Sequence, residues 1–142
     1  MSCVIKKKED EDIIPLYRNL FNKDNGVHEL TFNDFYIDKK KLYLKNKFFL
    51  KNKGFVLFYA PWCSHCKKFK SDYENLALDY IQLYPFGAVN TENVKDENDK
   101  LRVFADVDKI PKLKVIHKDG YLEDFDSNLS YNDLLYYLNM NI

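Results

Sequence analysis

The sequence predicts one α/β domain in which helices flank a mixed β-sheet. Its 142 residues fit a single domain. Hydrophobic residues make up 46% and aromatic residues 16% of the chain, enough to build a core. Strand-like apolar runs alternate with helix-like spacings in the order β-α-β-α-β-α-β-β-α. We expect residues 27–142 to form the domain and residues 1–26 to form a partly mobile N-terminal extension, since residues 6–12 are all charged.

The first half of the domain contains one strong strand signal. Residues 27–30 are expected to form a short strand, and residues 31–34 a helical turn. Residues 39–53 hold seven lysines among apolar residues, with a period that fits neither helix nor strand clearly. Residues 55–59 are apolar without alternation, which is typical of a strand buried on both faces. We therefore expect residues 55–59 to be central in the sheet.

The second half continues the alternation. Apolar residues spaced by three and four after Cys63 predict an amphipathic helix that ends before Pro85. Residues 86–90 are expected to form a strand, and residues 101–105 to lie in a helix. An Asp-Gly turn at residues 119–120 predicts a hairpin between residues 113–117 and 121–125. A last helix is expected to follow Ser130, a good N-cap residue.

Charge and hydropathy exclude several classes of function. The formal net charge is zero, so no global field attracts nucleic acid, and the lysines of residues 39–53 are interpreted as a solvated face. The longest apolar run, residues 54–62, is too short to cross a membrane. The charged N-terminus lacks the apolar segment of a secretion signal. We expect an intracellular, cytoplasmic protein, in which cysteines tend to be catalytic or metal-binding.

Cys63 and Cys66 stand three residues apart at the start of the predicted helix. This spacing places both on one helix face, close enough for a disulfide. The helix N-terminus stabilises a thiolate at Cys63 and lowers its pKa. Cys63 is thus the expected nucleophile on a substrate disulfide, and Cys66 the thiol that resolves the mixed disulfide. Zinc would require four ligands, and the sequence has no second Cys-x-x-Cys pair, so we expect no metal.

The segment Tyr-Ala-Pro-Trp-Cys-Ser-His-Cys-Lys, residues 59–67, resembles the active site of the thioredoxin superfamily and is most similar to protein disulfide isomerase domains. Residues 109–113 resemble the loop of that family that ends in a cis proline. The resemblance implies a thioredoxin-like three-layer α/β/α sandwich with a central mixed β-sheet flanked by helices. It also implies that Ile110 and Pro111 face the cysteines and dock the substrate. His65 is interpreted as tuning the redox potential, the alternative being an exposed spacer. Trp62 is expected either in the apolar surface around the site or in the core.

Three charged residues of the family pattern are replaced here. The buried acid six residues before the first cysteine is Leu57, its lysine partner is Ala88, and an arginine near the last helix is Leu129. Joint loss of a buried ionic set can be nearly neutral for stability. Transfer of the proton of Cys66 is expected to suffer, because an apolar neighbourhood raises the pKa of a thiol.

The resemblance implies a thiol-disulfide oxidoreductase of the disulfide isomerase type. It implies protein thiol or disulfide substrates, a thiol oxidase or reductase as redox partner, and no organic cofactor. From the zero net charge and the short apolar runs we expect no binding of nucleic acid or membrane, and we expect a monomer. Two alternatives are a catalytically relaxed peptide-binding module, favoured by the missing charges, and a dimer bridged by iron–sulfur or zinc through two Cys-x-x-Cys pairs. Cys3 is interpreted as a free thiol in the tail, the alternative being a regulatory or intermolecular role. His28 and His117 are interpreted as surface or core residues rather than ligands. The chain has 20 Lys, 2 Arg and 14 Asn, a bias typical of an AT-rich genome such as that of a large DNA virus or a protist. If the source is such a virus, packaging in the virion is also expected.

Overall fold

The protein was analysed as a computed structural model that describes residues 3–4, 18–52, 54–81 and 83–140. The central sheet has five strands in the order β2-β6-β5-β8-β9. These strands are β2 (Val27–Glu29), β5 (Phe55–Tyr59), β6 (Phe86–Asn90), β8 (Lys112–Ile116) and β9 (Leu122–Asp124). Strands β2, β6 and β5 are parallel, and β8 and β9 are antiparallel to their neighbours. The mixed sheet predicted from the sequence is confirmed.

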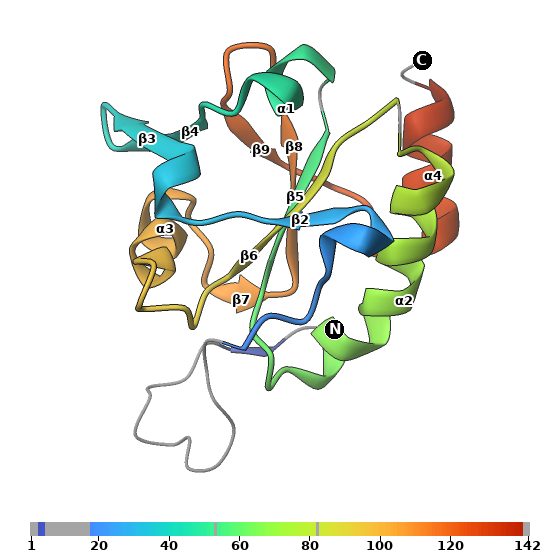
Figure 1. Cartoon of the computed structure of the whole chain (residues 1–142), viewed down its shortest axis with the longest axis horizontal. Coiled ribbons are helices and arrows are strands. Elements are labelled where there is room, and N and C mark those ends of the chain that lie inside the picture. Colours follow the sequence, from blue (N-terminus) through green and yellow to red (C-terminus); the bar gives the residue numbers. More distant parts are fainter. Residues whose placement is uncertain (1–2, 5–17, 53, 82, 141–142) are drawn as a thin grey trace.

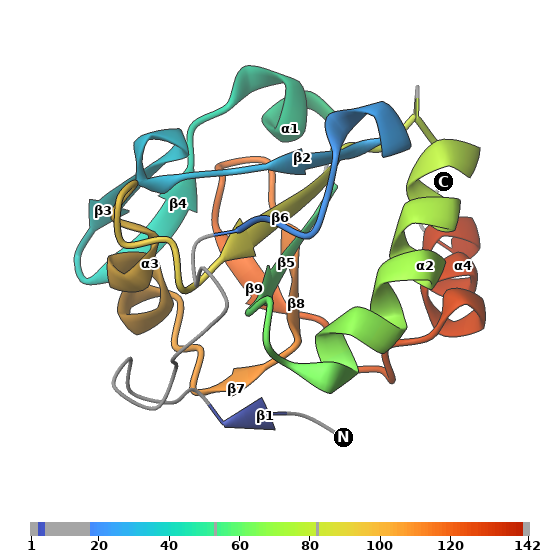
Figure 2. The same ribbon diagram turned by 60° about the horizontal axis from the view of Figure 1, so that its bottom comes forward.

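Helices cover the sheet from both sides (Figure 1). Helices α2 (Ser64–Asp79) and α4 (Tyr131–Met140) lie together on one face, where the ring of Phe86 contacts Tyr73 of α2 and the ring of Phe55 contacts Tyr137 of α4. Helices α1 (Lys47–Asn52) and α3 (Asn98–Phe104) lie on the other side of the sheet, as both ribbon views show (Figure 2). The arrangement is the expected α/β/α sandwich.

The ambiguous segment at residues 39–53 divides between two structures. Its first part completes a hairpin of β3 (Phe35–Asp38) and β4 (Lys41–Leu44), and its second part forms α1. Leu42, Leu44 and Phe49 are buried, whereas the described lysines of this segment are exposed. The interpretation as a solvated lysine face agrees with this exposure. The expected helical turn is a short 3-10 helix, η3 (Phe32–Asp34).

Strand β5 is the centre of the core, since all five of its side chains are buried. Its neighbours β6 and β8 bury most of their residues as well, which explains the absence of polar alternation in the sequence of β5. Because β5 and β6 are parallel and Tyr59 pairs with Asn90, these two residues lie at the same end of the sheet. The chain continues from this end to Cys63.

The N-terminal extension has described residues at both ends. Cys3–Val4 forms β1, which pairs antiparallel with β7 (Lys109–Ile110). Another 3-10 helix, η2 (Lys23–Asn25), precedes β2. The expected mobility of the extension falls largely on residues 5–17, outside the described residues, and the domain boundary at residue 27 stays a prediction. In the part of the chain that is described, no helix has the length and apolarity required to span a membrane.

Candidate active site

Cys63 occupies the N-cap of helix α2. Its backbone N–H donates to the carbonyl of Ala60 at 3.1 Å, which closes a tight turn after β5, and its own carbonyl accepts from the N–H of Lys67 at 3.1 Å. The unpaired N–H groups and positive dipole end of the helix therefore face the sulfur of Cys63. Such a position stabilises negative charge on sulfur.

The loop at residues 110–111 meets Cys63. The peptide bond between Ile110 and Pro111 is cis, which confirms the expectation taken from the family resemblance. The Sγ atom of Cys63 lies 3.8 Å from the carbonyl oxygen of Ile110, although the two residues are 47 positions apart in the chain. Ile110 is buried and Pro111 is half-buried. The structure thus brings together the two motifs that the sequence analysis singled out.

Cys63 is bonded to Cys3. The disulfide joins residues 60 positions apart, with a Cα–Cα distance of 6.0 Å, and Cys66 is left as a free, buried cysteine. The interpretation of Cys3 as a free thiol is therefore wrong. The physical reason is the pairing of β1 with β7, which places Cys3 opposite Ile110 and so beside Cys63. Only the β-branched Val4 and Ile5 after Cys3 gave a weak strand signal in this segment.

Cys66 lies inside the first turns of α2 and is 1% exposed. Burial raises the pKa of its thiol to about 12, and hydrogen bonds from the backbone N–H groups of Ala60 and Cys66 offset only part of this effect. Leu57 and Ala88, which replace two charged residues of the family pattern, are register partners and are fully buried. The expected high pKa of Cys66 is confirmed.

A buried carboxyl group lies on β2, in the same row as Leu57 and Ala88. Ala88 is the register partner of Glu29 on one side and of Leu57 on the other. The carboxylate of Glu29 accepts hydrogen bonds from the hydroxyl of Tyr59 and from the backbone N–H of Phe21, the latter at 3.1 Å, while its Oε1 atom is buried without a partner. Burial raises the pKa of Glu29 to about 7. Sequence reasoning missed this group because its strand pattern fits an outward-facing residue equally well.

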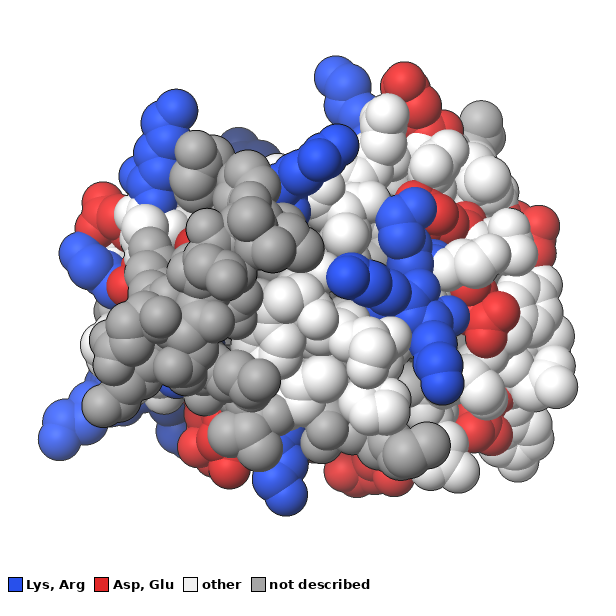
Figure 3. All heavy atoms as spheres, turned by 90° about the horizontal axis from the view of Figure 1, so that it is seen from below, with Lys and Arg blue, Asp and Glu red and all other residues white. Residues whose placement is uncertain are grey.

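The remaining predicted residues surround the cysteines. Trp62 is half-buried, and its indole N–H donates to Glu92 at 3.3 Å, so the buried Glu92 is a supporting residue that the sequence did not reveal. His65 and Pro111 line one groove of about 540 Å³ next to Leu129, the third replaced position. Figure 3 views the end of the molecule where β1, β7 and the start of α2 lie. Its middle is uncharged, with lysine or arginine and acidic side chains around it.

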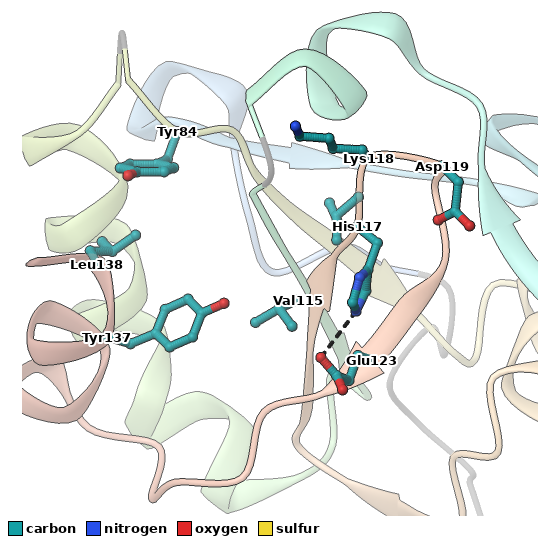
Figure 4. Close-up of a pocket in the computed structure, with 9 residues that line it drawn as sticks. Tyr84, Val115, His117, Lys118, Asp119, Glu123, Tyr137 and Leu138 are labelled. Carbon is teal, nitrogen blue, oxygen red and sulfur yellow. Dashed lines mark hydrogen bonds and ion pairs between the residues drawn. The ribbon is translucent and has the colours of Figure 1, made fainter. Parts of the chain in front are cut away.

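A second concavity, of about 480 Å³, lies at the opposite end of the sheet (Figure 4). Val115 lines it and pairs with Phe55, the first residue of β5, whereas Cys63 follows the last. His117 stands at its wall with Nε2 3.0 Å from the carboxylate of Glu123. Among the lining residues there is no cysteine. This pocket is therefore separate from the disulfide chemistry.

The described residues contain no group of three or more His, Cys, Asp or Glu side chains that could hold a metal ion. His28 is exposed on β2 and packs beside the rings of Phe48 and Phe49, and His117 is exposed after β8. The two histidines thus belong to different parts of the surface. This agrees with their interpretation as surface residues.

Comparison with known proteins gives one family. Residues 39–140 match the family described as Thioredoxin. Protein disulfide-isomerase 1 of Dictyostelium discoideum is 35% identical over 86 residues, which are 60% of this chain and 24% of that protein. Protein disulfide-isomerase A4 of Mus musculus is 29% identical over 116 residues, 80% of this chain and 16% of that protein. The chain thus spans about a quarter or less of these relatives.

Solved structures show the same fold. The crystal structure of the J-Trx1 fragment of ERdj5 superimposes with a TM-score of 0.59 at 20% sequence identity, covering 84% of this chain and 53% of that one. At this identity, the likeness establishes the arrangement of helices and strands. The chemistry must be argued from the residues of this chain.

Proposed function

Because the chain belongs to the thioredoxin family, we propose that it is a thiol-disulfide oxidoreductase that acts on protein substrates, with Cys63 as the attacking thiol and Cys66 as the resolving thiol. The observation that carries the proposal is the position and bonding of the Cys63 sulfur. Its sulfur stands at the N-terminus of α2, beside Ile110, and is already joined to the sulfur of a cysteine on a strand docked at β7. This is the geometry of a mixed disulfide.

In the first step, the thiolate of Cys63 attacks one sulfur of a substrate disulfide. A bond forms between Cys63 and that sulfur, and the other substrate sulfur leaves as a thiolate that takes up a proton. The helix N-terminus favours the thiolate of Cys63 over its thiol, because the dipole and the free N–H groups interact with negative charge.

In the second step, the thiolate of Cys66 attacks the Sγ atom of Cys63. A disulfide forms between Cys63 and Cys66, and the substrate sulfur leaves reduced. Since Cys66 is buried with a pKa of about 12, only a small fraction is ionised near neutral pH, and this step is expected to limit the overall rate. Run backwards, the same two steps donate a disulfide to a dithiol.

Ile110, Pro111, Trp62 and His65 are the residues we assign to the substrate. The edge of β7 pairs with an extended strand, so the main chain at Lys109–Ile110 can hold a substrate segment whose cysteine then meets Cys63. Trp62 is held in place by Glu92. The groove that contains His65 and Pro111 can take side chains of the same segment. Each of these residues lies at the same end of the sheet as Cys63.

Net oxidation or reduction of substrates requires a second thiol-disulfide couple, because the electrons enter and leave as thiols and disulfides. A thiol oxidase would return the pair to the disulfide, and a reductase would return it to the dithiol. The exchange itself needs no organic cofactor. The direction of electron flow is set by the reduction potential of the pair against that of its partner.

One observation favours a second candidate function, that of a peptide-binding module with little turnover. Leu57 and Ala88 are buried apolar residues where the family pattern has an acid and its lysine partner, and the pKa of Cys66 is high. A domain that formed mixed disulfides and resolved them slowly would retain substrates rather than release them.

The reduction of insulin by a dithiol, followed by turbidity, tests the proposal. We expect the parent protein to accelerate the reaction and Cys63→Ser to abolish the effect. With the dithiol left out, Cys3→Ser/Cys66→Ser should form mixed disulfides with insulin that mass spectrometry detects on Cys63, because no second thiol of the site can resolve them. Ser71→Ala, an exposed change on α2, serves as the matched control. A parent protein that traps insulin peptides on Cys63 without turnover supports the binding module. Insulin adducts on Cys66 of the Cys63→Ser variant would reverse the roles of the two cysteines.

A further inference from the structure

The N-terminal strand β1 occupies the place at which a substrate would react. We propose that Cys3 is a third redox-active cysteine of the site: β1 docks on β7 as an internal substrate, and the Cys3–Cys63 disulfide keeps Cys63 in a protected form from which Cys66 releases it. This inference rests on the proposed function, because it takes Cys63 as the attacking thiol.

The register of β1 determines which sulfur meets Cys63. Cys3 pairs with Ile110 and Val4 with Lys109, and the carbonyl of Ile110 is the group that lies 3.8 Å from the sulfur of Cys63. A shift of one residue would turn the side chain of Cys3 to the other face of the pair. The observed register is therefore the one that brings the sulfur of Cys3 to the sulfur of Cys63.

The bond also closes the site. Cys63 is 0% exposed when it is joined to Cys3, and β1 pairs with both residues of β7. An extended substrate would need the same main-chain edge and the same sulfur. Substrate and β1 are therefore mutually exclusive, and the disulfide protects Cys63 from further oxidation and from reaction with other disulfides.

The N-terminal extension has a second anchor near Cys63, formed by Asn19 and Leu20 close to where the described residues resume. The backbone N–H of Leu20 donates to the hydroxyl of Tyr59 at 2.9 Å, and the side-chain amide of Asn90 donates to Asn19 at 3.2 Å. Tyr59 is the last residue of β5 and Asn90 is the last residue of β6, at the end of the sheet from which the chain continues to Cys63. This anchor keeps Cys3 close to Cys63 even when their bond is broken. The effective concentration of such a tethered thiol is on the order of millimolar.

The exchange is balanced within the chain. The thiolate of Cys66 attacks the Sγ atom of Cys63, a Cys63–Cys66 disulfide forms, and the Cys3–Cys63 bond breaks. Cys3 leaves as a thiolate and takes up a proton equivalent to the one that Cys66 lost, so no external oxidant or reductant is consumed. In the reverse direction, the thiolate of Cys3 attacks Cys63 in the Cys63–Cys66 disulfide and restores the protected form.

The test uses the full chain with Cys66→Ser, which stops the release step, and the matched double variant Cys3→Ser/Cys66→Ser. Both proteins are reduced, exposed to glutathione disulfide in the presence of about 0.1 mM reduced glutathione, alkylated and digested with trypsin without reduction. Since a millimolar tethered thiol exceeds this concentration about tenfold, the single variant should contain residues 1–6 linked to residues 54–67 about ten times more often than glutathione on Cys63. The double variant should carry glutathione on Cys63 instead.

Each other outcome decides between the two proposals. A single variant with glutathione on Cys63 and a free Cys3 would overturn the role of Cys3 and leave Cys63 as a reactive nucleophile. If Cys63 reacts neither with Cys3 in the single variant nor with glutathione in either variant, the proposed function is overturned and this inference with it.

Discussion

Leu57 on β5 pairs directly with Ala88 on β6, and neither side chain reaches solvent. A carboxylate at residue 57 would therefore have residue 88 as its neighbour across the parallel ladder. We expect Leu57→Glu to speed the decay of a mixed disulfide on Cys63 at pH 7, because a carboxylate can accept the proton of Cys66. The Leu57→Glu substitution should lower the free energy of unfolding by on the order of a few kcal/mol, because it buries an unpaired charge.

Stopped-flow measurement of mixed-disulfide decay checks this prediction, with Leu57→Gln as a control of similar shape that accepts no proton. Ala88→Lys in the Leu57→Glu background should recover part of the lost stability by pairing with the new carboxylate. Glu29 is the other register partner of Ala88 and would compete for the ammonium group, so the recovery should be larger when Glu29→Gln is added. Equal decay rates for Leu57→Glu and Leu57→Gln would show that residue 57 has no part in proton transfer.

The central strand and the start of α2 could be predicted because their signals are local. Residues 55–59 contain no charged side chain and no apolar-polar alternation, and the Cys-x-x-Cys pair begins four residues after them, so sequence alone located both strand and helix. The segment at 39–53 could not be resolved, because the same lysine-rich pattern serves the outer positions of a hairpin and of a helix. Cys3 and Glu29 depend on partners 60 and 30 positions away, at Cys63 and Tyr59, and no local pattern encodes such contacts.

The resolving step should depend steeply on pH. As long as the pH stays below the Cys66 pKa of about 12, each increase of one pH unit raises the thiolate fraction about tenfold. We therefore expect the decay of a glutathione mixed disulfide on Cys63 to accelerate about tenfold per pH unit between pH 7 and pH 9. The Cys3→Ser background removes competition from the internal strand, and Cys66→Ser in that background measures decay by other routes. A plateau near pH 8 would contradict the high pKa of Cys66.

Glu29 should make the protein less stable as the pH rises. Its folded-state pKa of about 7 lies above the ordinary glutamate value of 4.5, so the folded state binds the proton more tightly than the unfolded state. The free energy of unfolding should thus fall between about pH 4.5 and pH 7 and stay level above, with a total loss of about 3 kcal/mol at about 1.4 kcal/mol per pKa unit.

Glu29→Gln imitates the protonated group and should remove this part of the pH dependence. The variant should match the parent near pH 4 and exceed its stability near pH 8, as measured by urea unfolding at several pH values. Asp126→Asn, at an exposed position after β9, controls for the loss of a surface charge. If the difference between parent and Glu29→Gln is the same at pH 4 and pH 8, the pKa of Glu29 is not raised.

Tyr73 ties helix α2 to the sheet by a buried hydrogen bond. Its hydroxyl donates to the carbonyl of Gly87 on β6 at 2.8 Å, and the side chain is 0% exposed among the rings of Phe21, Phe69 and Phe86. Tyr73→Phe keeps the ring packing and removes only the hydroxyl, which leaves the carbonyl without this donor. We expect a loss of about 1–2 kcal/mol in the free energy of unfolding. Tyr136→Phe removes the hydroxyl of a side chain that is 68% exposed on α4 and should change stability by less than about 0.5 kcal/mol. Equal effects of the two substitutions in urea unfolding would mean that the contact with Gly87 contributes nothing to holding α2 on the sheet.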